Sequence, residues 1–72
     1  MAPRNRKAIK LIERVAHNIK YHRLKRGLSQ EKFEDASGLT ISRYESAKND
    51  MTLTTISILS KHLDIEPYEL LK

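Results

Sequence analysis

The sequence has no cysteine, only two glycines and no long apolar run. Without cysteine there are no disulfides and no thiolate metal sites, and three scattered histidines lack the spacing of metal ligands. No apolar stretch reaches the length of a membrane span or of a signal-peptide core, so we expect a soluble, cytoplasmic protein without a membrane partner. Seventy-two residues make one small domain with a thin core.

The sequence also lacks the features that mark an enzyme. It has no cysteine nucleophile, no glycine-rich phosphate loop and no paired carboxylates with a base nearby. A domain this small leaves little room for a substrate pocket. We therefore expect no catalysis, no metal, no cofactor and no small-molecule substrate.

The net charge of +5 is unevenly distributed along the chain. Residues 1–26 contain nine basic residues and one acidic residue, whereas residues 27–72 contain five basic and eight acidic residues. A basic N-terminal third of the chain favours attraction to a phosphate backbone, although runs of like charge more often form a solvated helix face. The charge therefore indicates a polyanion as partner without naming it.

The N-terminal third divides into an arm and a helix. Residues 1–7 have no apolar anchor and are expected to form a mobile basic arm, of the kind that follows phosphates or enters a minor groove. From Ala8 to Arg26 apolar residues recur at steps of three and four, which predicts an amphipathic helix that ends at Gly27: Ile9, Ile12, Val15, Ala16 and Ile19. His22 continues this stripe as a half-buried packing residue.

The central stretch, residues 28–45, reads as two short helices joined by a tight turn. Ser29 is a good N-cap, and Leu28 can pack on Phe33 as a hydrophobic staple. Gly38 suits the left-handed end of the first helix, and Thr40 is placed to cap the second. This pattern is a helix-turn-helix, whose second helix fits the major groove of DNA, although similar corners occur in small helical domains that bind no nucleic acid.

The C-terminal part predicts two more helices. A polar connector, residues 46–51, precedes Thr52, which caps a helix with an apolar face formed by Leu53, Ile56, Leu59 and Leu63. A turn at residues 64–66 leads to a last helix, Pro67–Leu71, because proline fits the first helical position. The chain is thus expected to be all-α, with five helices and no strand in one domain, residues 8–72.

Four segments resemble the Cro/CI-type (XRE-like) helix-turn-helix family of bacterial and phage regulators. They are Val15–Arg23, Gly27–Phe33, Ile41–Glu45 and Leu53–Leu71. The resemblance implies a five-helix lambda-repressor-like domain that binds operator DNA as a two-fold homodimer and regulates transcription. The main rival is a protein-interaction module, such as an antitoxin or adaptor, which keeps the fold with weakened operator reading.

The chain departs from this family around the turn. Between Gly38 and Ile41 it is about three residues shorter than the family pattern, where base contacts are often made. Glu34 stands where the family usually has a small residue, which supports an alternative, namely a shortening inside the first of the two helices. A third register keeps the turn at full length, buries Tyr44 and Ala47, and shortens the loop after the second helix. We prefer Ile41 and Tyr44 inward, because residues 41–71 then follow the family without further gaps.

The resemblance also implies roles for individual residues. Gln30 matches the glutamine that binds a phosphate, and Arg43 is expected outward, where it can pair with a guanine edge. The other residues implied for DNA contact are Thr40 and Ser42, beside Arg43, and Ser46, Lys48 and Asn49, in the loop that follows. A structural ion pair is expected between Arg23 and Glu45. The dimer interface is expected at Tyr68, Leu70 and Leu71.

Overall fold

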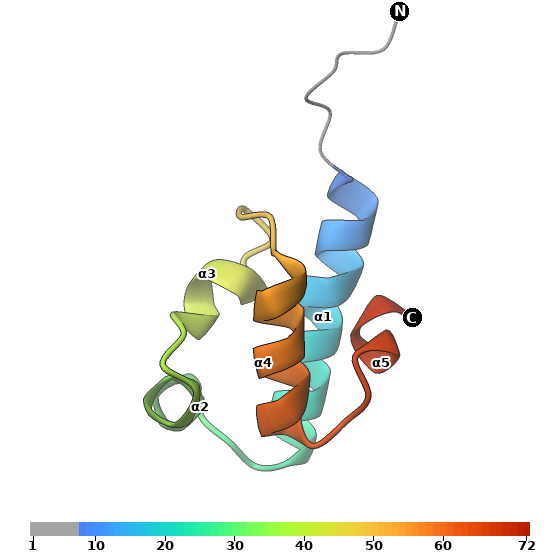
Figure 1. Cartoon of the computed structure of the whole chain (residues 1–72). Helices are drawn as coiled ribbons and strands as arrows, with labels where there is room; N and C mark the ends of the chain where they lie inside the picture. Colours follow the sequence, from blue (N-terminus) through green and yellow to red (C-terminus); the bar gives the residue numbers. More distant parts are fainter. Residues whose placement is uncertain (1–7) are drawn as a thin grey trace, which may run out of the picture.

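The computed structural model describes residues 8–72, and helices are the only regular secondary structure in that part of the chain. They are α1 (Ile9–Lys25), α2 (Gln30–Ser37), α3 (Ile41–Glu45), α4 (Leu53–Leu63) and α5 (Tyr68–Leu71), and the described residues include no strand. In Figure 1, α1 lies behind α4, with α2 and α3 on one side and α5 on the other. The expected all-α class is confirmed, whereas the expected mobile arm, residues 1–7, lies outside the described residues.

Every helix contributes to one hydrophobic core. The largest fully buried side chains are Ile19 from α1, Phe33 from α2, Ile41 from α3, Leu59 and Leu63 from α4, and Leu70 from α5. Leu28 packs against this cluster immediately before α2, as expected for a staple residue. Because α3 and α5 have only five and four residues, their helical form depends on this shared packing.

Side-chain or glycine caps define three of the helix ends. The Ser29 hydroxyl accepts a hydrogen bond from the Lys32 amide at 3.1 Å, and the Thr52 hydroxyl accepts one from the Thr55 amide at 3.0 Å. Gly38 ends α2 in the left-handed conformation, with φ of 75°. These three predictions are confirmed. Thr40 precedes α3 as predicted, but its side chain caps no amide of α3, so that part of the prediction is wrong.

Two apolar residues expected on inward faces are exposed instead. Ile9 is 61% exposed and Leu53 is 85% exposed. Each is the first residue of its helix, α1 or α4. In addition, Leu53 lies about 60° around the helix from Ile56, at the edge of the buried face. Met51, which precedes α4, packs against the core from the loop.

Ala47 adopts a left-handed backbone conformation, with φ of 62°. This conformation costs an L-residue roughly 1–2 kcal/mol and costs glycine little. We therefore expect Ala47→Gly to stabilise the domain by roughly 0.5–1 kcal/mol, because its added unfolded-state entropy offsets only part of the relieved strain. Urea unfolding measures this as a higher midpoint. Ala36→Gly, at an exposed helical position of α2, should instead lower the midpoint, and a lower midpoint for both variants would contradict the assignment.

Candidate nucleic-acid interface

Helices α2 and α3, joined at residues 38–40, form the helix-turn-helix. Ile41 is fully buried and Tyr44 is half-buried against the core, as the preferred register predicts. Ser42 and Arg43 lie between these two inward positions and are exposed. The outer face of α3 therefore presents a hydroxyl and a guanidinium to the solvent.

An ion pair joins the end of α1 to the end of α3. Arg23 Nε lies 2.6 Å from Glu45 Oε2, and Arg23 Nη2 donates to Glu45 Oε1 at 3.1 Å. The two side chains are 7% and 5% exposed. Arg23 Nη1 also donates to the Leu28 carbonyl at 2.7 Å. The two partners expected from the sequence are thus in a bidentate, buried contact.

Gln30 extends this network to the start of α2. Its Nε2 donates to Glu45 Oε1 at 3.0 Å, so that Glu45 accepts hydrogen bonds from α1 and from α2. The amide nitrogen of a glutamine carries two hydrogens, and one hydrogen bond to Glu45 leaves the other for a further acceptor. The network therefore fixes the Gln30 side chain beside the N-terminus of α2, where anions are favoured.

The loop after α3 contains three of the residues expected to contact DNA. Ser46 Oγ donates to the Arg43 carbonyl at 2.8 Å, and Asn49 Nδ2 approaches the same carbonyl at 3.5 Å. Both side chains thus hold the C-terminal end of α3. Lys48 lies between them in sequence and is exposed, as is Thr40 before α3. Among residues 8–72, no carboxylate is within salt-bridge distance of Arg43 or Lys48.

Glu34 has a contact that the sequence pattern did not predict. Its Oε2 accepts a hydrogen bond from the Ser42 amide at 3.3 Å, across the turn. The sequence signal was the acidic side chain itself, which is unusual where the family resemblance calls for a small residue. The bond shows how a larger side chain is accommodated at this position.

The residues expected at a dimer interface differ in accessibility. Tyr68 is 59% exposed and Leu71 is 42% exposed, but Leu70 is fully buried. Leu70 belongs to the core of its own domain, so its assignment to an intermolecular interface is wrong. Leu71 instead borders a small apolar groove of about 150 Å³ together with Leu11, Met51 and Leu53.

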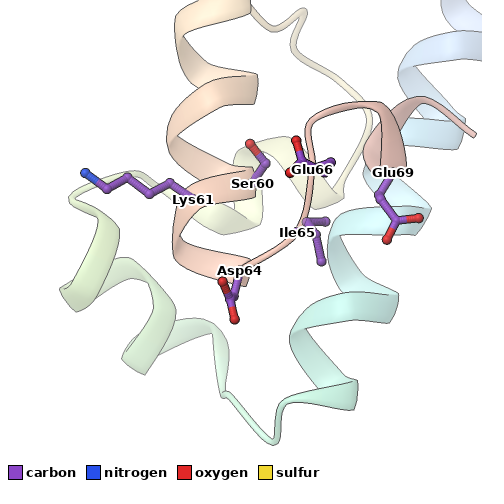
Figure 2. A pocket seen from close by; sticks show the side chains of 6 residues that line it. All are labelled: Ser60, Lys61, Asp64, Ile65, Glu66 and Glu69. Carbon is purple, nitrogen blue, oxygen red and sulfur yellow. The ribbon is translucent and has the colours of Figure 1, made fainter.

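A larger hollow of about 390 Å³ lies at the turn between α4 and α5 (Figure 2). It is lined by Ser60, Lys61, Asp64, Ile65, Glu66 and Glu69. The excess of carboxylates disfavours phosphate. A hydrogen bond from Lys72 lowers the pKa of Glu69, which makes this carboxyl a poor general acid near neutral pH. In the part of the chain described, no cluster of ligating side chains suits a metal, and no helix is long and apolar enough to span a membrane.

Comparison with known protein families identifies the family to which this helix-turn-helix belongs. The model of the family HTH_3, described as helix-turn-helix, matches residues 19–70, which include the C-terminal part of α1, all of α2, α3 and α4, and most of α5. Comparisons with curated proteins and with solved structures gave no match. The family match covers well over half of the chain and coincides with the caps, the turn and the outward face of α3. The chain therefore belongs to the XRE-type, Cro/CI-like helix-turn-helix family of DNA-binding transcriptional regulators.

Proposed function

We propose that this chain is a sequence-specific regulator, of the repressor or controller type, which acts in the cytoplasm and binds an operator as a homodimer. The observation that carries the proposal is the exposed Arg43 on a recognition helix held at both ends. Hydrogen bonds from Ser46 and Asn49 reach its C-terminal end, and Glu34 accepts one from its N-terminal end. A rigid element presents a base-reading group more accurately than a loop does.

In this proposal Arg43 reads a base. Its guanidinium has no carboxylate partner among residues 8–72, so pairing with a guanine edge breaks no ion pair seen here. Thr40 and Ser42 are the short side chains beside it and contact bases or sugars at close range. These three residues carry the sequence information of the complex.

The remaining polar residues position the domain on the duplex. Gln30 binds a phosphate through its free amide hydrogen and the N-terminus of α2. Lys48 supplies a charge from the loop after α3, and the arm, residues 1–7, adds further phosphate contacts. Ser46 and Asn49 shape that loop and bring it to the backbone. Contacts of this kind fix register and orientation without selecting a sequence.

The salt dependence of binding tests the phosphate assignment. Lys48→Ala should weaken binding to the selected site and to random duplex alike, and should flatten the slope of log affinity against log salt by about one unit. Lys72→Ala is the matched control, because Lys72 is paired with Glu69 at 3.0 Å. A slope for Lys48→Ala equal to that of the wild type would remove Lys48 from the interface.

The proposed homodimer uses the exposed apolar residues around α5. The apolar groove is bordered by Leu53 and Leu71, and Tyr68 is exposed on the same short helix as Leu71. Apolar surface is therefore exposed to solvent on α5 and at the start of α4. Burying such a surface against a second copy is the usual role of exposed apolar patches in small domains. The two-fold arrangement also places two recognition helices on one duplex.

Leu71→Glu tests this interface. The added charge should shift the chain toward monomer, and it should weaken operator binding more than it lowers thermal stability. Sedimentation at several concentrations measures the shift, with Leu24→Glu as the control, since Leu24 is 56% exposed near the C-terminal end of α1, away from the groove. Wild-type chain that sediments as a monomer where it still binds DNA tightly would contradict the dimer.

The short recognition helix favours a second candidate. With only five residues in α3, a protein-interaction module such as an antitoxin or adaptor, with weakened operator reading, is the alternative. Such a module would retain salt-dependent attraction to duplex DNA without preferring any sequence. Comparison of a selected site with random duplex at fixed salt distinguishes the two candidates.

A further inference from the structure

The N-terminal end of α3 has no cap of its own. Thr40 occupies the N-cap position, yet its side chain accepts no hydrogen bond from the first turn. The backbone amides of the first turn need hydrogen-bond acceptors from elsewhere, because the helix itself supplies none for them. In this structure the Ser42 amide donates to Glu34 Oε2 at 3.3 Å, so the cap comes from another helix.

Glu34 is well placed to make this contact. It lies in the last turn of α2, and its backbone carbonyl accepts from the Gly38 amide at 2.8 Å, which ties it to the start of the turn. Its side chain is half-buried. The carboxylate thus bridges the two helices across residues 38–40, directly before the exposed Arg43.

We propose that Glu34 is a positioning residue of the DNA-binding site, which holds the N-terminal end of α3 and thereby aims the Arg43 guanidinium. This inference rests on the proposed function, in which Arg43 reads a base. A helix of five residues is too short to hold its direction by its own hydrogen bonds. Its direction is set by Ile41 in the core, by the Glu45 ion pair at one end and by Glu34 at the other.

The charge of Glu34 has a second effect. A carboxylate near the expected base-reading end of α3 repels the phosphates of any duplex, whatever its sequence. Selected and random duplex share this repulsion, so it lowers both affinities and cancels in their ratio. Glu34 therefore raises discrimination by aiming Arg43, whereas its charge weakens binding to every duplex.

Two substitutions separate these effects. E34Q removes the charge but keeps an oxygen that accepts from the Ser42 amide, whereas E34A removes both. Amide hydrogen exchange of Ser42 reports the cap without DNA, and the ratio of affinities for selected and random duplex reports the aim of Arg43. We expect the Ser42 amide to exchange about tenfold faster in E34A than in E34Q. The affinity ratio should be about tenfold lower in E34A than in E34Q.

Both variants should bind random duplex more tightly than the wild type, and by similar factors, because they share the same change in charge. Asp35→Asn and Asp35→Ala are the controls for charge, since Asp35 is an exposed neighbour in α2 with no bond to α3 among the described residues. These two control variants should match each other in Ser42 exchange and in affinity ratio.

Equal Ser42 exchange and equal affinity ratios in E34A and E34Q would overturn the positioning role. If E34A does not fold, E34D takes its place, because the shorter side chain keeps the charge and loses the reach. If the wild-type chain prefers no sequence, the proposed function fails. In that case the exchange comparison still decides whether Glu34 holds α3.

Discussion

Glu45→Ala is expected to lower the free energy of unfolding by about 3 kcal/mol, because it leaves the Arg23 guanidinium buried without its counter-ion. The two side chains are 7% and 5% exposed, so water cannot replace the lost partner easily. The substitution also removes the acceptor of the Gln30 amide. For a domain of this size the melting temperature should fall by more than about 10 °C.

Glu31→Ala is the matched control for this change. Glu31 is an exposed acidic residue in the first turn of α2 and makes no salt bridge within residues 8–72. Its removal should change the melting temperature by only a few degrees. The double variant Arg23→Met, Glu45→Leu should regain much of the stability, because neither charge remains buried. Equal melting temperatures for Glu45→Ala and Glu31→Ala would show that the pair does not stabilise the fold.

Arg43→Ala is expected to cost about 1–3 kcal/mol of binding free energy on the selected site and little on random duplex. The difference arises because a base contact carries sequence information and a phosphate contact does not. Thermal stability should be nearly unchanged, since the Arg43 side chain is exposed. Fluorescence titration with both duplexes at one salt concentration measures the effect.

Arg14→Ala controls for the loss of one positive charge, because Arg14 is exposed on α1 and lies outside the helix-turn-helix. It should lower both affinities slightly and leave their ratio unchanged. If Arg43→Ala weakens binding to both duplexes by the same factor, Arg43 contacts the backbone. Sequence reading then falls to Thr40, Ser42 or DNA shape.

Local signals predicted the helices well because each depends on a few neighbouring residues. Ser29, Gly38 and Thr52 act as caps or helix ends through their own side chain or backbone. The inward position of Ile41 was also predictable, because the apolar face of a short amphipathic helix is the face that packs on the core. The order of the helices followed from these assignments, and so did most of the core, apart from Ile9 and Leu53, which are exposed.

Features that depend on tertiary geometry were not predictable in this way. Thr40 looked like the cap of α3, but the acceptor comes from Glu34, eight residues away from the Ser42 amide. Leu70 looked available for a partner, but α1 holds α5 close: the Asn18 side chain donates to the Leu70 carbonyl at 3.0 Å, and Leu70 turns into the core. The period of the apolar residues indicates which face of a helix is to be buried, but it does not show which surface covers that face.

Selection of bound sequences from a random duplex pool tests the central proposal, sequence-specific operator binding, most directly. The proposed function predicts enrichment of one site with two-fold related halves about one helical turn apart, bound at least about a thousandfold more tightly than random duplex at physiological salt. Salt-dependent binding without enrichment of any sequence would contradict it, and would favour the protein-interaction module instead.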